Sequence, residues 1–443
     1  MAGDWLRMSA GDLGRAIGAG RIDPVALTEA YLEAIAAHPH APRIYARTTM
    51  ERALAEAGAA HARARDGARL GPLDGVPVSW KDLFDTAGVV TEAGSALLAG
   101  RVPTRDAAVL RNATAAGLVC LGKTHMSELA FSGLGLNPVT ATPPCVNDES
   151  AVSGGSSSGA AASVAFGLAA AAVGSDTGGS VRIPSAWNDL VGLKTSSGRL
   201  SLTGSVPLAA SFDTVGPLTR TVEDAALMLA ALGGGRAADL RGASLRGTRF
   251  MILKTVGMEN LRDAPRAGFT SAVERLQAAG AIVNTAEAPE VAQAMDLAAI
   301  LFTAEAYGTW GQQIEAAPER MFPPILERFR AGAQYTAADF VAAWHRLRDL
   351  RAQWAARVAG YDAVLLPTSP ILPPDAARLM SDGDYYVTEN LLALRNTRVG
   401  NLMDCAALTL PTGVPSCGIM FLGAPGGEER LLRIGAAAEA ALA

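Results

Sequence analysis

The sequence predicts an α/β fold in which short buried strands alternate with helices, and three observations support this. Apolar residues make up 49% of the 443 residues and charged residues 18%, which is enough material for a large core. Short apolar runs bounded by glycine, proline or polar residues recur along the chain, as is typical of buried strands. Segments with helical periodicity and capping residues lie between them. Strands that alternate with helices favour a substantially parallel sheet.

The expected elements follow from these signals in chain order. The first helix begins at Asp23-Pro24, where an N-cap residue precedes proline at the first helical position, and a charged, Ala-rich helix covers about 50–66. Further strands are expected at 75–80, 118–121, 170–174, 250–253, 281–283, 362–367 and 418–422, and further helices at 108–116, 157–167, 222–232, 264–279, within 291–316, at 336–358 and at 427–442. Residues 132–153 carry several prolines and polar residues and are expected to form a loop.

Charge and composition disfavour several classes of function. The formal net charge is −5, and no basic stripe, RNP motif or zinc-finger spacing occurs, so we expect no nucleic-acid partner. The longest apolar stretch, 160–174, falls short of the roughly 20 residues that span a bilayer, so we expect no membrane partner. The initial M-A-G-D-W-L-R-M has no apolar secretory core, and Cys120, Cys145, Cys405 and Cys417 form no CxxC pair. We therefore expect a cytoplasmic protein with reduced thiols.

Residues 153–159 read S-G-G-S-S-S-G and raise the question of whether one of these serines does chemistry. A linker is disfavoured because the stretch runs directly into an apolar helix. A Walker phosphate loop needs a lysine after the glycines, and none follows. Residues 155–159 match the G-x-S-x-G nucleophile elbow with Ser157 in the centre, but that elbow needs a preceding strand, and a loop is expected here instead.

A serine nucleophile also needs a base. Only His345 lies beyond these serines, within the helical run A-A-W-H-R-L-R where a surface histidine is expected, so a Ser-His-Asp triad is disfavoured. A lysine can act as the base if burial or a nearby positive charge keeps it neutral. Lys81 ends an apolar strand and is placed for that role, although its position alone favours a surface lysine that begins a loop.

Three segments together resemble the amidase signature family. They are G-V-P-V-S-W-K-D-L-F-D-T-A-G (75–88), S-G-G-S-S-S-G-A-A-A (153–162) and G-S-D-T-G-G-S-V-R-I-P-S-A-W-N-D-L-V-G-L-K (174–194), with further matches at 122–133, 211–224, 362–368 and from 401. The resemblance covers nearly the whole chain and makes the G-x-S-x-G match a coincidence. It implies a single domain over 1–443 whose central mixed, twisted sheet is covered on both sides by helices. The core motif region is expected at about 75–224 and a more variable helical region at about 225–360.

The resemblance implies a Ser-cisSer-Lys catalytic triad. The nucleophile is the serine that ends D-T-G-G-S, here Ser180. The first serine after the paired glycines, Ser156, follows a cis peptide bond and relays protons, and neutral Lys81 ends the relay as the base. Backbone amides of the glycine-rich turn are expected to form the oxyanion hole, namely those of Thr177, Gly178, Gly179 and Ser180.

The family pattern also indicates residues near the substrate. Ala130, Phe131 and Ser132 match the segment that lines the acyl pocket in relatives. Arg182 follows the nucleophile by two positions, and the matching arginine contacts a substrate carboxylate in some relatives and supports the loop in others. Asp213 matches a supporting carboxylate that is expected to pair with Arg182 or with the serine loop.

The sequence thus predicts an amidohydrolase that cleaves the C–N bond of a small amide through an acyl-enzyme at Ser180, without a metal or cofactor. The expected pocket residues Ala130, Phe131, Met126 and Trp187 are small or apolar, which favours an aryl or alkyl amide. Esters and carbamates undergo the same chemistry. The alternatives are the amide-cleaving component of a glutamyl-tRNA(Gln) or aspartyl-tRNA(Asn) amidotransferase and a non-catalytic scaffold of the same fold. A monomer or homodimer is expected.

Overall fold

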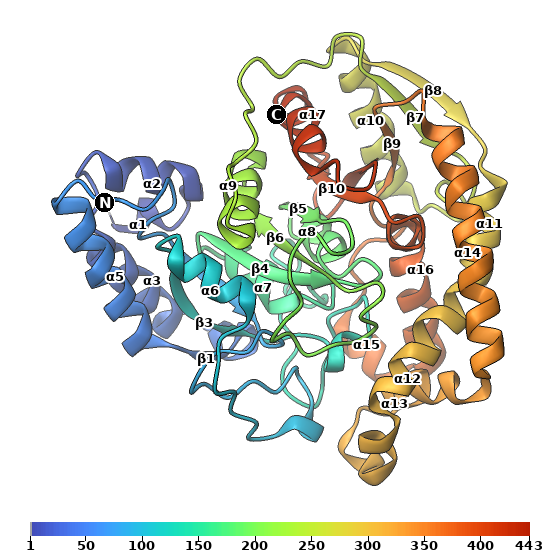
Figure 1. Cartoon of the computed structure of the whole chain (residues 1–443), viewed down its shortest axis with the longest axis horizontal. Coiled ribbons are helices and arrows are strands. Elements are labelled where there is room, and N and C mark those ends of the chain that lie inside the picture. Colours follow the sequence, from blue (N-terminus) through green and yellow to red (C-terminus); the bar gives the residue numbers. More distant parts are fainter. Residues whose placement is uncertain (1) are drawn as a thin grey trace.

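The computed structural model describes residues 2–443, and within that range eleven strands form one mixed sheet (Figure 1). In order across the sheet the strands are β1 (Tyr45–Thr48), β3 (Val119–Thr124), β2 (Pro77–Lys81), β4 (Ala171–Asp176), β6 (Thr214–Thr219), β5 (Val191–Lys194), β10 (Ala406–Pro411), β11 (Gly418–Gly423), β9 (Ala363–Pro367), β7 (Arg249–Leu253) and β8 (Ile282–Ala286). The predicted α/β class with a central mixed sheet is confirmed.

Strand direction divides the sheet into two parallel blocks joined by antiparallel strands. β2 runs parallel to β3 and β4, and β7 runs parallel to β8 and β9. The other neighbouring pairs are antiparallel. The sequence analysis missed β1, β5, β6 and β10, so its expectation of a substantially parallel sheet is corrected. β6 contains Gly216 and Pro217, and β1 and β5 have only four residues each, so none of these three shows an extended strand pattern.

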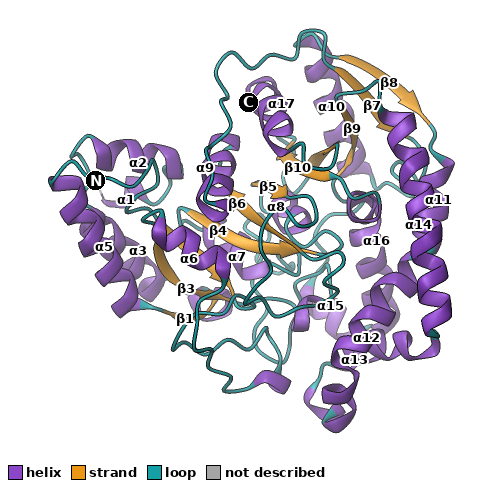
Figure 2. Cartoon of the chain, viewed as in Figure 1, coloured by secondary structure: helices purple, strands orange, loops and turns teal. Residues whose placement is uncertain are grey.

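Helices cover both faces of this sheet (Figure 2). They are α1 (Ala2–Trp5), α2 (Ala10–Gly18), α3 (Pro24–Ala37), α4 (Ala41–Ile44), α5 (Met50–Arg65), α6 (Ala108–Ala115), α7 (Ser158–Ala165), α8 (Arg182–Trp187), α9 (Val222–Gly233), α10 (Asp263–Ala278), α11 (Pro289–Asp296), α12 (Ala298–Ala316), α13 (Pro323–Arg330), α14 (Ala337–Val358), α15 (Ala376–Ser381), α16 (Gly383–Leu402) and α17 (Glu428–Leu442). Successive residues of β10 illustrate the two layers, because Leu408 lies against Gly435 of α17 whereas Thr409 lies on the side of α8.

Several helix ends match the capping signals of the sequence. Asp23 Oδ1 accepts a hydrogen bond from Val25 N at 2.7 Å at the start of α3. Thr336 and Asp339 form a capping box at the start of α14. Helix α9 ends at Gly234, whose φ of +68° is the left-handed conformation that glycine adopts without strain. Local capping chemistry therefore predicted these boundaries to within a residue or two.

Helix α16 is the longest element that the sequence analysis missed. Its buried residues include Asn390, Asn396, Thr397 and Asn401, so no clean apolar stripe of helical period marks it. These polar residues are buried because they bond to loops of the core; Asn401 Nδ2, for example, donates to Asp176 Oδ1 at 3.0 Å. The helix therefore passes directly beside the glycine-rich turn that follows β4.

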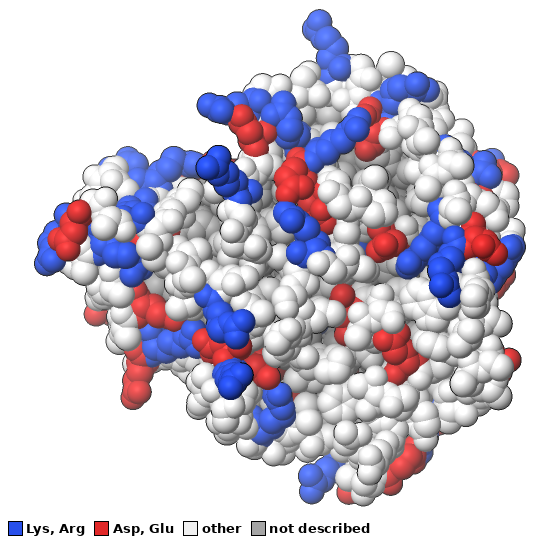
Figure 3. All heavy atoms as spheres, in the orientation of Figure 1, with Lys and Arg blue, Asp and Glu red and all other residues white. Residues whose placement is uncertain are grey.

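The surface and the thiols agree with the sequence analysis. Positive and negative side chains are interspersed on the face that Figure 3 shows, without a stripe of one sign. No helix in residues 2–443 combines the length and apolar character needed to cross a bilayer. Cys120, Cys145, Cys405 and Cys417 are buried and form no disulfide. The predicted site lies where β2 and β4 end, at the carboxyl edge of parallel strands where ligands bind in α/β sheets.

Candidate active site

Lys81 is the last residue of β2 and lies wholly inside the protein. All five residues of this strand are buried, with β3 on one side and β4 on the other. The Nζ atom of Lys81 donates to Ser156 Oγ at 2.7 Å and to Ser175 Oγ at 2.8 Å. Among the described residues no carboxylate lies within ion-pair distance of this amine. The position is therefore buried, and the interpretation of Lys81 as a surface residue is wrong.

The surroundings of Lys81 favour its neutral form. Burial lowers the pKa of Lys81 to about 7, because the charged amine loses its hydration inside the protein. The negative charges of Asp213 and Asp176 act from a distance and oppose this shift only in part. At neutral pH a large share of the molecules thus carries an uncharged amine, whose lone pair can accept a proton from a hydroxyl.

Ser156 lies in the loop that leads into α7, and its side chain is fully buried. The Gly155–Ser156 peptide bond is cis, as predicted. Position 155 has no room for a side chain, since a Cβ there would lie 2.5 Å from Gly135 N and 2.5 Å from Ser127 Oγ. The carbonyl of Ser156 also accepts a hydrogen bond from Ser127 N at 3.1 Å. Close packing of the loop thus holds the hydroxyl of Ser156 beside Lys81.

Ser180 lies in the turn between β4 and α8 and borders a cavity. Its hydroxyl forms no hydrogen bond with another described residue. Ser157 N donates to the carbonyl of Ser180 at 3.2 Å, which joins the two serine loops through their backbones. The structure thus brings Lys81, Ser156 and Ser180 into one region, but it links only Lys81 and Ser156 directly through their side chains.

The turn from Thr177 to Ser180 presents three free backbone amides. Those of Thr177, Gly178 and Ser180 have no hydrogen-bond partner among the described residues. The prediction for Gly179 is corrected, because its amide already donates to Asp176 Oδ1 at 2.9 Å. Gly179 is needed for another reason: its φ is +143°, and a Cβ there would lie 2.1 Å from Thr397 Oγ1.

Arg182 supports this turn from behind and does not reach the cavity. Its side chain is fully buried, and Nε and Nη2 donate to the two carboxylate oxygens of Asp176 at 2.9 and 2.8 Å. The remaining donors bond to the Thr397 carbonyl at 2.7 Å and to Asn401 Oδ1 at 2.6 Å. The prediction of Arg182 as a substrate contact is therefore wrong, and the alternative of a supporting arginine holds, because every direction of its guanidinium is occupied by protein.

Asp213 supports the serine loop, the second of the two roles expected for it. Its carboxylate accepts hydrogen bonds from Thr177 Oγ1 and from the backbone amides of Leu208 and Ala209. It does not pair with Arg182, whose carboxylate partner is Asp176. Asp213 thus fixes the first residue of the turn that carries the free amides.

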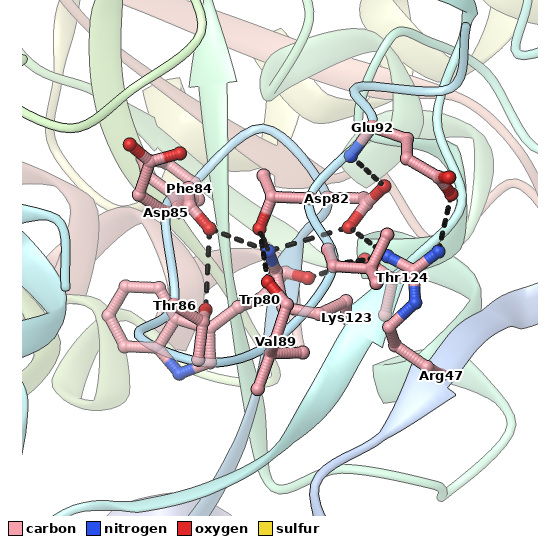
Figure 4. A network of polar contacts seen from close by, with 12 residues as sticks. Arg47, Trp80, Asp82, Phe84, Asp85, Thr86, Val89, Glu92, Lys123 and Thr124 are labelled. Carbon is pink, nitrogen blue, oxygen red and sulfur yellow. Dashed lines mark hydrogen bonds and ion pairs between the residues drawn. The ribbon is translucent and has the colours of Figure 1, made fainter. Parts of the chain in front are cut away.

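A second buried lysine lies on the neighbouring strand, and Figure 4 shows its surroundings. Lys123 Nζ, on β3, donates to the Phe84 carbonyl at 2.6 Å and to Thr91 Oγ1 at 2.9 Å. It also lies 3.4 Å from Asp82 Oδ1, and Arg47 Nη1 lies 3.0 Å from the same oxygen (Figure 4). The charge of Asp82 is thus compensated by other cations, although this residue directly follows Lys81 in the sequence.

The cavity beside Ser180 has a volume of about 310 Å³ and contains charged groups that the sequence analysis missed. Ala130, Phe131 and Ser132 line it, at the positions expected for the acyl pocket. The other lining residues are Thr177, Gly178, Ser180, Leu208, Phe302, Arg328, Leu394 and Arg398. The two arginines come from α13 and α16, outside the motifs that the sequence analysis used. In sequence each lies in a helical run of mixed charge and resembles a surface residue, so no local signal identifies it.

Two residues expected at the pocket lie elsewhere. Met126 and Trp187 are fully buried and do not line the cavity. Trp187 packs in a separate apolar cluster, where its Nε1 donates to the Ile371 carbonyl at 3.2 Å. The apolar pocket inferred from these side chains is therefore corrected to one with a polar, positively charged wall.

Comparison with known proteins now identifies the family. The family model described as Amidase matches residues 26–432. The chain belongs to the amidase signature family. It is 35% identical to a 2-amino-5-chloromuconic acid deaminase of Comamonas testosteroni, over 98% of this chain and 97% of that protein. It is also 32% identical to the first-lettered component of the glutamyl-tRNA(Gln) amidotransferase of Chloroflexus aurantiacus, over 95% and 93%. A solved structure described as an amidase has a TM-score of 0.87 and 31% identity, over 98% of this chain and 99% of that one.

Membership in this family makes the protein a hydrolase that acts on amides. The geometry of this amidase also bears on the competing interpretations of its serines. Ser157 occupies the N-cap position of α7, and its hydroxyl donates to the Ser175 carbonyl at 3.2 Å. Residues 153–156, which precede it, form no strand. His345 is exposed on α14. The nucleophile elbow and the Ser-His-Asp triad therefore lack the strand and the buried base that they require.

Proposed function

We propose that this amidase hydrolyses the C–N bond of a small amide through an acyl-enzyme at Ser180, with Ser156 as the proton relay and Lys81 as the base. The observation that carries the proposal is the buried 2.7 Å contact between Lys81 Nζ and Ser156 Oγ. No carboxylate among the described residues lies close enough to hold the amine in its charged form. A pKa near 7 suits a general base that works near neutral pH.

In the acylation step, Ser180 Oγ attacks the carbonyl carbon of the amide. Its proton passes to Ser156 Oγ while the proton of Ser156 passes to Lys81 Nζ, which becomes charged. The carbonyl oxygen takes up negative charge, and the amides of Thr177, Gly178 and Ser180 donate to it; losing one such donor costs about 10²–10³ in rate. The proton then returns from Lys81 through Ser156 to the departing nitrogen, the C–N bond breaks, and the amine or ammonia leaves.

The second half of the reaction repeats this proton route with water in place of the serine. Water attacks the acyl group, gives its proton to the relay and releases the carboxylic acid, while Ser180 Oγ recovers its proton. Only the acyl carbonyl and a leaving group that accepts a proton enter this scheme. We therefore include esters and carbamates among the proposed substrates.

The relay needs a contact between the hydroxyls of Ser156 and Ser180, which form no hydrogen bond in the described structure. The backbone hydrogen bond from Ser157 N to the Ser180 carbonyl keeps the two loops adjacent. Catalytic hydrogen bonds of a free enzyme are often long or misaligned and tighten only in the substrate complex. Binding of the substrate carbonyl by the free amides of the turn would orient Ser180 for this contact.

Active-site labelling combined with a substrate panel tests the proposal. We expect a fluorophosphonate probe to modify Ser180 of the wild type and to leave Ser180→Ala unmodified. Primary amides, anilides, esters and carbamates, scored by kcat/KM, should include compounds whose hydrolysis the same substitution abolishes. A correctly folded wild type that is neither labelled nor active on any member of the panel would contradict the proposal and favour the non-catalytic scaffold.

A second candidate function rests on the similarity to the amidotransferase component. In that role the protein would release ammonia from glutamine for use by a partner protein on a charged tRNA. Gel filtration and ammonia release from glutamine, with and without candidate partner proteins, separate the two functions. Turnover of small amides by the isolated chain favours the hydrolase, whereas glutamine cleavage that appears only with partners favours the amidotransferase.

A further inference from the structure

Two arginines in the cavity beside Ser180 have no acidic partner. Arg328 Nη1 donates to the Phe131 carbonyl at 3.0 Å, and its guanidinium carbon lies 4.4 Å from the centre of the Phe131 ring. Arg398 forms no hydrogen bond and no ion pair with any described residue. Both side chains line the cavity and are partly buried. Two positive charges thus share one small space without a counter-charge from the protein.

Other partly buried arginines of this protein are compensated. Arg47, Arg52 and Arg63 pair with Asp82, Asp106 and Asp74 at 3.0, 2.9 and 2.6 Å. Arg220 has no carboxylate contact but donates to five backbone carbonyls. The absence of any such partner for Arg398 is therefore a local property of the cavity, and not the general way in which this fold holds arginine.

The acidic residues around the cavity already have other partners. Glu128 accepts hydrogen bonds from Ser95 Oγ and Phe322 N, at 2.7 and 2.9 Å. Glu327, next to Arg328 in the sequence, pairs with Arg330 instead. Asp213 is occupied by Thr177 and by two backbone amides. None of these carboxylates among the described residues is free to approach the two arginines.

An unpaired, partly buried guanidinium is costly, because it loses hydration without gaining a counter-charge. Burial lowers the pKa of Arg328 to about 10 and that of Arg398 to about 9, and repulsion by Arg328 contributes to the second shift. This cost is removed when an anion occupies the cavity. Guanidinium groups suit a carboxylate in particular, since they can present two parallel N–H donors to its two oxygens.

The arginines lie on the side of the cavity where the acyl group of a substrate would sit. Arg398 lies beside the turn that carries the free amides, since a Cβ placed on Gly178 would lie 3.7 Å from Arg398 Cγ. Arg328 contacts Phe131, in the segment that lines the same cavity. An anion held by both arginines would therefore be a short distance from the carbonyl that Ser180 attacks, within the same molecule.

We propose that Arg328 and Arg398 bind a carboxylate on the acyl part of the substrate, so that the preferred substrates are monoamides of short dicarboxylic acids. This inference rests on the proposed amidase function and narrows it to one class of amide. The arginines orient the acyl group, and the products are then a dicarboxylate and ammonia. The two cations select against the neutral aryl and alkyl amides that the sequence alone favours, because such amides leave both arginines unpaired.

Matched substrate pairs test this inference. Succinamate, glutaramate and adipamate are compared with butyramide, valeramide and hexanamide by kcat/KM on the wild type. We expect the best carboxylate-bearing amide to exceed its neutral counterpart by about 10²-fold or more, since charge-assisted hydrogen bonds in a partly buried site are strong. Equal rates within each pair, on an enzyme that Ser180→Ala inactivates, would overturn the inference and leave the amidase function intact.

Variants of the arginines identify the residues responsible. In Arg328→Gln and Arg398→Gln, the ratio of kcat/KM for the carboxylate-bearing amide to that for the neutral amide should fall by about 10²-fold. Arg330→Gln is the matched control on the same helix, since Arg330 pairs with Glu315 at 2.9 Å and does not line the cavity, and it should keep the wild-type ratio. An unchanged ratio in both cavity variants would contradict the proposal.

Protection from labelling gives a readout that does not depend on turnover. Glutarate should slow fluorophosphonate labelling of Ser180 in the wild type, and about tenfold more of it should be needed in Arg398→Gln. The labelling rate without glutarate also reports whether each variant is folded. No protection of the wild type by millimolar glutarate, or equal protection of wild type and variant, would count against the arginine site. Absence of labelling altogether would instead contradict the proposed function.

Discussion

Lys81 and Lys123 are buried lysines on adjacent parallel strands, and the protein surrounds them in opposite ways. In the register of β2 and β3, Trp80 pairs with Lys123 and Lys81 with Thr124, so the two lysines are one step apart. Lys123 has a carboxylate, that of Asp82, within 3.4 Å. Lys81 has hydroxyls at 2.7 and 2.8 Å and no carboxylate within ion-pair distance among the described residues.

The difference shows how one sheet edge keeps one lysine charged and leaves another free to titrate. Burial lowers the pKa of both amines, but for Lys123 the neighbouring Asp82 opposes the shift directly. For Lys81 the opposing carboxylates are more distant, and its pKa falls to about 7. Lys123 is therefore suited to hold the turn after β2, and Lys81 is suited to exchange a proton with Ser156.

The largest expected contrast is in activity. Lys81→Met should lower kcat/KM by about 10⁴-fold or more, as should Ser180→Ala, because members of a nucleophile–base unit are lost together. Lys123→Met should stay within about tenfold of the wild type, when rates are normalised to the fraction that fluorophosphonate labels. A Lys81→Met enzyme with wild-type rates would overturn the assignment of the base.

The serine loop provides the next contrast. Ser156→Ala should lower kcat by about 10³-fold, because the proton loses its path from Ser180 to Lys81. Ser157→Ala and Ser158→Ala should lose less than about tenfold, since their hydroxyls bond to the Ser175 and His125 carbonyls and not to Lys81. If Ser157→Ala were the inactive variant, the nucleophile elbow would return as the better explanation.

The pH dependence of kcat/KM gives the third contrast. The folded-state pKa of Lys81 lies near 7, below the ordinary value of 10.5, so the base is charged and inactive in acid. We expect kcat/KM to rise about tenfold per pH unit up to pH 7 and then to level off, which is about 10²-fold between pH 5 and pH 7. Lys123→Met should keep this profile, and a rate that stays flat down to pH 5 would exclude a neutral-lysine base.

The smallest contrast is in stability. Lys123→Met should lower the free energy of unfolding by about 3 kcal/mol, because it leaves the buried carboxylate of Asp82 with Arg47 alone. Lys81→Met should lower it by only about 1–2 kcal/mol, since the unpaired hydroxyls of Ser156 and Ser175 are offset by removal of an amine that is costly to bury. Urea denaturation of both variants checks this order, and the reverse order would contradict the comparison.

The sequence was sufficient for elements with local signals and insufficient for elements defined by tertiary contacts. The caps at Asp23 and Thr336 and the short apolar runs of β2, β4 and β9 marked their elements to within a few residues. Strand β6 interrupts its apolar pattern with Gly216 and Pro217, and α16 buries asparagines that only the folded core can satisfy. No periodicity of hydrophobic residues could reveal these two elements.

The same division holds at the candidate site. Lys81, Ser156 and Ser180 lie in motifs that the sequence shows directly, and the structure brings them into one region. The environment that would make Lys81 a base depends on what is absent around it, and no motif encodes an absent carboxylate. Arg328 and Arg398 are separated by 70 positions and meet only through the packing of α13 and α16 beside the cavity.

The protonation of Lys81 can be measured directly, because the chain contains only four lysines, Lys81, Lys123, Lys194 and Lys254. Lysine labelled with ¹³C at Cε gives one resonance per residue in a two-dimensional NMR spectrum, and Lys81→Met assigns the resonance of interest by its disappearance. We predict that this resonance titrates with a midpoint near pH 7 while that of Lys123 titrates at a higher pH. A Lys81 resonance that stays in its charged position up to pH 9 would contradict the central claim.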